Sequence, residues 1–110
     1  MPPGLLGEVE QFVLLALLRL ERPQYGVPVL EEIAARTGHT PSRAAIYIAL
    51  QRLEAKGFLA SRLGDPTAER GGRARRYYEL TPAGLAVLRD ARRAQLSMWA
   101  NVEHRLEPKG

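Results

Sequence analysis

The sequence predicts a mainly helical α+β fold in one domain, and three observations lead to this prediction. The chain has 110 residues, a length typical of a single domain. Apolar residues recur at helical spacing over four segments, whereas only residues 58–63 and 74–80 alternate as strands do. The composition is 45% hydrophobic and 25% charged, which is ordinary for a globular protein and argues against wholesale disorder.

Composition also excludes several classes of protein. The chain has no cysteine, which rules out disulfides, thiolate zinc sites and cysteine nucleophiles. Its longest apolar run, residues 12–18, is far shorter than the ~20 residues of a membrane span. The residues before Phe12 include Glu8 and Glu10 and no base, unlike a signal peptide. We therefore expect a cytoplasmic protein with no membrane partner.

Three helices are expected in the first half of the chain. The first is apolar nearly all round and ends before Pro23, so it should lie at the centre of the fold. Pro28 suits the first turn of a second helix, which Gly38 terminates. Ser42 is a good N-cap for a third helix over residues 43–56. One side of this third helix carries the apolar residues Ile46, Ala49, Leu50 and Leu53.

A hairpin and a long helix complete the predicted fold. Strands at 58–63 and 74–80 flank a loop at 64–73, which is long for a plain hairpin. Thr81 and Pro82 then begin a helix that extends to about residue 105. Such a helix would be roughly 36 Å long, too long for its own domain to cover. Its apolar stripe, which a second copy would cover, consists of Leu85, Leu88, Leu96, Trp99, Val102 and Leu106.

Positive charge is concentrated in one third of the chain. Residues 43–76 contain eight basic and three acidic residues, whereas the rest contains eight basic and nine acidic ones. A polyanion is the natural partner of such a region. A solvated basic face is the alternative that charge alone leaves open.

The order of elements is that of a winged helix with an added C-terminal helix. The second and third helices form a helix-turn-helix and the hairpin forms the wing, so the basic third of the chain is the groove helix plus the wing. We expect residues 1–80 to form the winged-helix DNA-binding domain. Residues 81–110 should form a dimerisation helix within the same compact unit.

The chain resembles the short transcriptional regulators of the PadR family. The matching pieces are residues 7–11 with Leu14-Leu15-Ala16-Leu17; Tyr25-Gly26; Ser42, Ile46-Tyr47, Leu50, Arg52-Leu53-Glu54 and Lys56-Gly57; residues 71–78; and Leu80-Thr81-Pro82 with Gly84. The resemblance implies a homodimer, joined through the first and last helices, that binds palindromic promoter DNA and usually represses. The chain departs from the family pattern at Ala44, where Gly is common, and at Val27 and Pro28.

The groove helix and the wing supply the expected DNA-binding residues. Arg43 lies in the first turn of the groove helix, where Arg commonly reads guanine. For Tyr47, the alternative to a DNA contact is a half-buried ring between helix and hairpin. For Ile48, the alternative is an isolated surface residue. The wing arginines could equally be solvated, while Arg76 is expected to pair with an acid. The full expected set is Ser42, Arg43, Tyr47, Ile48, Gln51, Arg70, Arg73 and Arg75.

The dimer interface and an effector pocket are expected on the first and last helices. The expected interface residues are Leu5, Val9, Phe12, Leu88, Leu96, Trp99, Val102 and Leu106. Trp99, the only tryptophan, is expected to anchor this packing. As a further hypothesis, Trp99 and Phe12 line a pocket for a planar aromatic effector, since some members of the family sense such compounds.

Nothing in the sequence assembles a catalytic or metal site. His39 and His104 are far apart, no cluster has ligand spacing, and no phosphate-binding loop or nucleophile elbow is present. We therefore expect no enzyme activity and no cofactor. The predicted function is that of a DNA-binding regulator. Two alternative functions are a winged-helix adaptor that binds protein and an RNA-binding protein. An RNA-binding protein would need more exposed aromatic residues.

Overall fold

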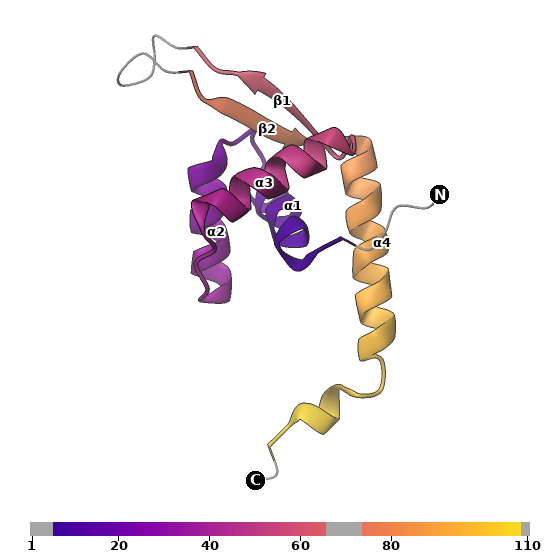
Figure 1. The fold of residues 1–110 in the computed structure, drawn as a ribbon. Helices are drawn as coiled ribbons and strands as arrows, with labels where there is room; N and C mark the ends of the chain where they lie inside the picture. Colours follow the sequence, from indigo (N-terminus) through magenta and orange to yellow (C-terminus); the bar gives the residue numbers. More distant parts are fainter. Residues whose placement is uncertain (1–5, 66–73, 109–110) are drawn as a thin grey trace.

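A computed structural model of the chain describes residues 6–65 and 74–108. Its elements follow the predicted order and confirm a mainly helical α+β winged helix (Figure 1). They are α1 (Glu8–Leu20), α2 (Gly26–Thr37), α3 (Arg43–Ala55), β1 (Leu59–Leu63), β2 (Arg76–Leu80), α4 (Pro82–Trp99) and the short 3₁₀ helix η2 (Glu103–Leu106). Three residues of the expected sites, Leu5, Arg70 and Arg73, lie outside the described residues.

The core lies where α1, α2 and α3 meet. The largest fully buried side chains come from all three helices: Leu14, Ile46, Leu50, Leu53, Val13 and Val29. α1 contacts every other helix and β2, as its apolar surface predicts. No polar or charged residue in the described part of the chain is buried, so the core is stabilised by apolar burial alone.

Helix ends follow the predicted signals. The Ser42 hydroxyl oxygen accepts the Ala45 N–H at 3.0 Å and caps α3. Gly38, with a φ of 76°, ends α2, and Gly57, with a φ of 83°, follows the last turn of α3. Both positions need a left-handed backbone, which glycine adopts without steric cost.

The two strands form an antiparallel hairpin in which Leu59 pairs with Leu80 and Leu63 with Arg76. They begin one and two residues later than the alternation predicted. Leu63 shares the face of Leu59, as expected, but it is 59% exposed because it lies beyond the helices that cover Leu59. Gln24, from the α1–α2 connection, adds a bridge to Tyr78 on the outer edge of β2.

The base of α4 is fixed closely to the hairpin. Thr81 Oγ1 accepts the Gly84 N–H at 3.0 Å and donates to the Gly57 carbonyl at 2.7 Å. Gly84 is buried, and a Cβ built on it would lie 2.2 Å from the Phe58 carbonyl oxygen. Glycine is thus the residue that lets the first turn of α4 approach the strand backbone.

The last helix is shorter than the apolar stripe predicted. It ends at Trp99, not near residue 105, and η2 follows it after a turn. Asn101 has a φ of 66°, and Asn is the non-glycine residue that most readily adopts this conformation at a helix end. The continued apolar spacing concealed this stop signal. From the middle of α4 onward, the chain runs away from the other helices (Figure 1).

Candidate nucleic-acid interface

α3 has a buried side and an exposed side. Ile46, Ala49, Leu50 and Leu53 are buried, and the opposite arc is exposed over about two and a half turns. That exposed arc consists of Arg43, Ala44, Tyr47, Ile48 and Gln51. All four predicted site residues of α3 therefore lie on one outward face, with the capping residue Ser42, also exposed, at its start.

Tyr47 is 43% exposed because one side of its ring rests on α2. A Cβ on Gly26 would come within 2.9 Å of the Tyr47 ring carbons and 3.1 Å of its hydroxyl oxygen. The ring therefore lies against the first residue of α2. Its contact with Gly26 fixes the ring while leaving its outer part accessible.

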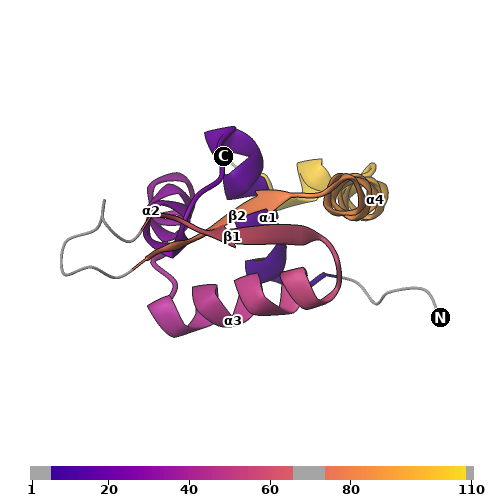
Figure 2. The same ribbon diagram turned by 90° about the horizontal axis from the view of Figure 1, so that it is seen from above.

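Arg75 is the described wing arginine of the predicted set, and it is exposed. Its guanidinium carbon lies 4.1 Å from the centre of the Tyr25 ring. Tyr77 meets the same ring edge-on, with centroids 5.7 Å apart and planes at 72°. In both ribbon views, the loop end of the hairpin and the N-terminal end of α3 lie on the same side of the molecule, away from α4 (Figures 1 and 2).

Two other cations of the basic region serve the fold. Lys56 forms an ion pair with Glu10 of α1 at 3.0 Å. Partial burial alone would raise the pKa of Glu10, but the hydrogen bonds from Lys56 and the Gly7 N–H, with the charges of Lys56 and Arg52, lower that pKa overall. Lys56 is thereby engaged within the domain.

Arg76 is linked to an acidic residue of its own subunit through a serine hydroxyl group. It donates to the Ser61 hydroxyl oxygen at 3.0 Å, and Ser61 in turn donates to the Glu54 carboxylate. The expected acid partner is thus reached through Ser61. Beside this chain, burial and the charge of Glu54 raise the pKa of Tyr78, which keeps the buried ring neutral.

Sequence reasoning missed Tyr25 as part of this surface. The Tyr25-Gly26 pair is one of the pieces that match the family, but the expected set of DNA-binding residues does not include Tyr25. Its two residues contact the wing and α3 respectively. An aromatic residue directly before a glycine, at the start of a helix, was the available signal.

Besides Tyr47 and Ile48 of α3 and Leu63 of β1, the exposed large apolar side chains of the described residues lie on α1, on α4 and in the residues after α4. On α1 they are Leu15 and Leu18; on α4 and beyond they are Leu85, Leu96, Met98, Trp99, Val102 and Leu106. Among the predicted interface residues, Leu88 is buried within its own chain, and Val9 and Phe12 pack partly against the core. Leu15 and Leu18 are exposed although α1 is apolar nearly all round, so this helix is not buried on every side.

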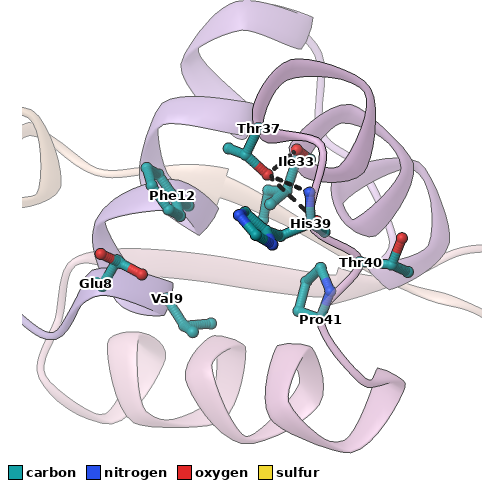
Figure 3. A pocket seen from close by; sticks show the side chains of 8 residues that line it. All are labelled: Glu8, Val9, Phe12, Ile33, Thr37, His39, Thr40 and Pro41. Carbon is teal, nitrogen blue, oxygen red and sulfur yellow. Dashed lines mark hydrogen bonds between the residues drawn. The ribbon is translucent and has the colours of Figure 1, made fainter. Parts of the chain in front are cut away.

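Phe12 lines a cleft of about 350 Å³ between α1 and the end of α2 (Figure 3). Its lining is Glu8, Val9, Phe12, Ile33, Thr37, His39, Thr40 and Pro41. Thr37 Oγ1 donates to the Ile33 carbonyl at 2.8 Å and accepts the His39 N–H at 3.1 Å, which orders one wall. Trp99 is not part of this lining, so one subunit does not bring the two predicted effector residues together.

No group of three or more potential metal ligands occurs among residues 6–65 and 74–108. In the same segments, no helix is both long and apolar enough to cross a membrane.

Comparison with known proteins places the chain in a family. The sequence model of the Transcriptional regulator PadR-like family matches residues 14–90. An uncharacterized protein of Lysinibacillus sphaericus is 32% identical over 99 residues, covering 88% of this chain and 83% of that protein. A Mycobacterium tuberculosis protein named as a transcriptional regulator is 43% identical over 72 residues, covering 64% of this chain and 61% of its own length.

Solved structures agree. A PadR family transcription regulator from Eggerthella lenta has a TM-score of 0.69 at 30% identity, covering 90% of this chain and 84% of its own. A PadR family transcription regulator from Clostridium difficile has a TM-score of 0.75, and the match covers 92% of this chain and 100% of that protein. Because the identity is 21%, this similarity supports the fold alone. Members of this family regulate transcription and are not enzymes. The chain belongs to the PadR-like family and is a DNA-binding transcriptional regulator.

Proposed function

We propose that the chain is a homodimeric, cytoplasmic repressor that binds a near-palindromic DNA site. One observation carries this proposal: the N-terminal end of α3, where Arg43 and Tyr47 are exposed, and the loop end of the hairpin lie on the same side of the molecule, away from α4 (Figures 1 and 2). An α-helix fits the major groove of B-form DNA, and a wing beside it can reach the adjacent backbone. One subunit thus presents both parts to one stretch of duplex.

The side chains of α3 suit base and backbone contacts. Arg43, in the first turn, is placed to bond O6 and N7 of guanine, and Ile48 to meet a thymine methyl group. Gln51, two turns further on, can pair with adenine. The hydroxyl groups of Ser42 and Tyr47 are donors for phosphate oxygens, and Ser42 can donate while its oxygen accepts the Ala45 N–H.

The wing arginines are proposed to bind phosphates. Arg75 is exposed, and Arg70 and Arg73, outside the described residues, belong to the same loop in the sequence. Phosphate contacts position a protein on the duplex without reading its sequence. Each such contact should contribute to the salt dependence of binding.

The apolar surface of α1 and α4 supports a homodimer. In one subunit, Leu96 and Trp99 of α4 and Val102, which follows it, are each at least 40% exposed, and an exposed apolar patch can mark an interface. A second copy would cover it with the same surface by two-fold symmetry. Two α3 helices would then lie roughly 34–36 Å apart, one turn of the duplex.

Effector release is proposed through the same interface. Phe12 and Trp99 lie apart in one subunit, so only the partner copy could bring a tryptophan near Phe12. A planar aromatic compound bound there would favour one angle between the two α4 helices. It would release DNA by shifting an existing equilibrium between angles.

The primary experiment is capture and sequencing of the genomic fragments that the protein binds, which yields the half-site and its spacing. On that operator, Arg43→Ala should cost about 1–3 kcal/mol and relax sequence preference at one position. Arg93→Ala is the matched control, since it removes the same charge from α4, where Arg93 pairs only loosely with Asp90 at 3.6 Å. Unchanged binding by Arg43→Ala would contradict the proposed contact of Arg43 with guanine. No duplex binding at physiological salt would contradict the proposal as a whole and favour a protein-binding adaptor.

A second experiment tests the dimer. A variant that stops after Arg93 lacks Leu96, Trp99 and the residues that follow. Sedimentation should then show monomers, and affinity for a two-half-site operator should fall to that for a single half-site. A dimer that survives this truncation would remove α4 and η2 from the proposed interface.

A further inference from the structure

We propose that Tyr25 is a positioning residue for DNA binding, which holds Arg75 of the wing in a fixed relation to α3. The proposal rests on the proposed function, in which α3 and the wing contact the same duplex. In this proposal, the connection between α1 and α2 fixes the position of the wing relative to α3, which neither element does by itself. Three consecutive residues, Gln24, Tyr25 and Gly26, carry the argument.

Tyr25 holds the arginine through its ring face. The Arg75 guanidinium carbon lies 4.1 Å above the ring centre, well within the distance at which a cation is attracted to an aromatic face. Tyr77 closes the other side of the arrangement with an edge contact at 5.7 Å, a favoured geometry for aromatic pairs. The long Arg75 side chain thus lies on a platform and does not sample the solvent freely.

Gln24 ties this platform to the hairpin. Its N–H donates to the Tyr78 carbonyl at 3.0 Å, and its carbonyl accepts the Tyr78 N–H at 2.8 Å. These two bonds add a one-residue third strand to the edge of β2. The backbone before Tyr25 therefore moves with the strand that carries Tyr77 and follows Arg75.

Gly26 ties the platform to α3. The Tyr47 ring lies so close to Gly26 that a Cβ there would approach within 2.9 Å. One connection therefore contacts β2, Arg75 and Tyr47 through three successive residues. The separation between the phosphate-binding and base-facing side chains is set before DNA arrives, which lowers the ordering cost of binding.

A double-mutant cycle on the full-length protein separates positioning from hairpin stability. The variants are Tyr25→Leu, Arg75→Ala and both together, with Tyr25→Phe as the matched control that keeps the ring. Affinity for the captured operator and for an unrelated duplex is measured at several salt concentrations. Thermal unfolding of each variant shows that binding is measured on folded protein.

Arg75→Ala should weaken binding to both duplexes alike. It should also lower the slope of log K against log salt concentration by about one unit. Tyr25→Leu should lose about three- to tenfold in affinity, the range of a cation–π contact, although it removes no charge. The double variant should bind no more weakly than Arg75→Ala alone, while Tyr25→Phe should bind like the parent. In a second cycle, Tyr25→Leu and Arg93→Ala should be additive, since Arg93 lies on α4 and pairs with Asp90.

The outcomes distinguish this inference from the proposed function. If Arg75→Ala leaves affinity and slope unchanged, the wing contact is wrong and the role of Tyr25 falls with it. If Arg75→Ala weakens binding but Tyr25→Leu does not, or the two losses simply add, only the positioning role is overturned. Should Tyr25→Leu fail to fold, the parent protein decides by NMR: the Arg75 Nε–H should be shifted upfield by the Tyr25 ring, and an unshifted resonance overturns the proposal.

Discussion

The body of the molecule, α1 to α3 with the hairpin base, and the distal arm, the second half of α4 with η2, use apolar residues for different ends. In the body, Leu14, Leu50 and Leu53 are fully buried. In the arm, Leu96 is 49% and Leu106 is 69% exposed. The same residue type therefore stabilises the subunit in one region and remains available to a second subunit in the other.

The boundary between the two regions lies in the middle of α4. Ala91 is the last buried residue of this helix, and one turn later Gln95 donates to Gln11 of α1 at 2.6 Å. Beyond this point the described part of the arm is exposed at every residue. A helix that continues past its own support needs a partner to hold it.

The largest expected effect compares a leucine in each region. Leu50→Ala should lower the free energy of unfolding by about 2–5 kcal/mol, because it removes a fully buried side chain from a closed core. Leu96→Ala should change it by less than about 0.5 kcal/mol in the separated subunit, as expected for an exposed site. Urea unfolding at several protein concentrations measures both values.

Concentration dependence is the decisive readout in this pair. The Leu50→Ala loss should be nearly the same at every protein concentration. The Leu96→Ala loss should be largest where the parent protein is dimeric and should shrink toward the separated-subunit value on dilution, because association adds to stability by mass action. Equal, concentration-independent losses at the two positions would contradict the division between body and arm.

The same division marks what the sequence could predict. Burial along α3 follows helical spacing alone, so its outward face, including Arg43 and Gln51, was predictable from local pattern. The end of α4 was not, because the apolar residues Val102 and Leu106 continue the stripe although Asn101 stops the helix. Apolar periodicity reports burial in the final assembly and therefore does not separate a subunit core from an interface.

Contacts between distant segments were also beyond the sequence. The pairing of Gln24 with Tyr78, and the contact of Tyr25 with Arg75, join residues about fifty positions apart. Such contacts depend on how the hairpin closes over the α1–α2 connection, which no spacing rule encodes. The motif Tyr25-Gly26 identified the position but not its partners.

Gly84 tests the junction between the hairpin base and the first turn of α4, the helix that leads into the arm. Replacing a helical glycine with alanine ordinarily stabilises a helix by about 1 kcal/mol. Here the added Cβ would lie 2.2 Å from the Phe58 backbone oxygen, so Gly84→Ala should instead destabilise by about 1–3 kcal/mol through overpacking. Ala83→Gly, at the exposed neighbouring residue, is the control and should cost about 1 kcal/mol through propensity alone. Stabilisation by Gly84→Ala in thermal unfolding would refute the close packing of α4 on the strand.

Thr81 tests the same junction through hydrogen bonds. Thr81→Val keeps the shape of the side chain but loses both the cap to Gly84 and the bond to the Gly57 carbonyl. We expect a loss of about 0.5–2 kcal/mol, the range for an N-cap. Thr81→Ser, which keeps the hydroxyl, should recover most of it in chemical denaturation. A serine variant as weak as the valine variant would assign the effect to packing of the methyl group.

The smallest effect compares one ion pair from each region. Glu10 and Lys56 lie 3.0 Å apart with Glu10 largely covered, whereas Asp90 and Arg93 of α4 lie 3.6 Å apart and are both more than 70% exposed. Since the pKa of Glu10 is lowered on folding, its contribution is present above the unfolded value near 4.5 and is lost as the pH falls through the lower folded value. Glu10→Gln should therefore cost about 0.5–1 kcal/mol at pH 7, a modest value because Lys56 is half exposed, and the difference from the parent should vanish in acid.

Asp90→Asn should cost nothing measurable at either pH, since two exposed partners gain little from pairing in water. Urea titrations of the parent and both variants between pH 7 and pH 3 supply the comparison, and added salt should shrink the Glu10 effect. A Glu10→Gln deficit that persisted unchanged at pH 3 would show that the carboxylate charge is not its source. Since a glutamine oxygen can still accept the hydrogen bond from the Gly7 N–H, 3.1 Å long in the parent, the deficit would then have to arise from altered packing at the start of α1.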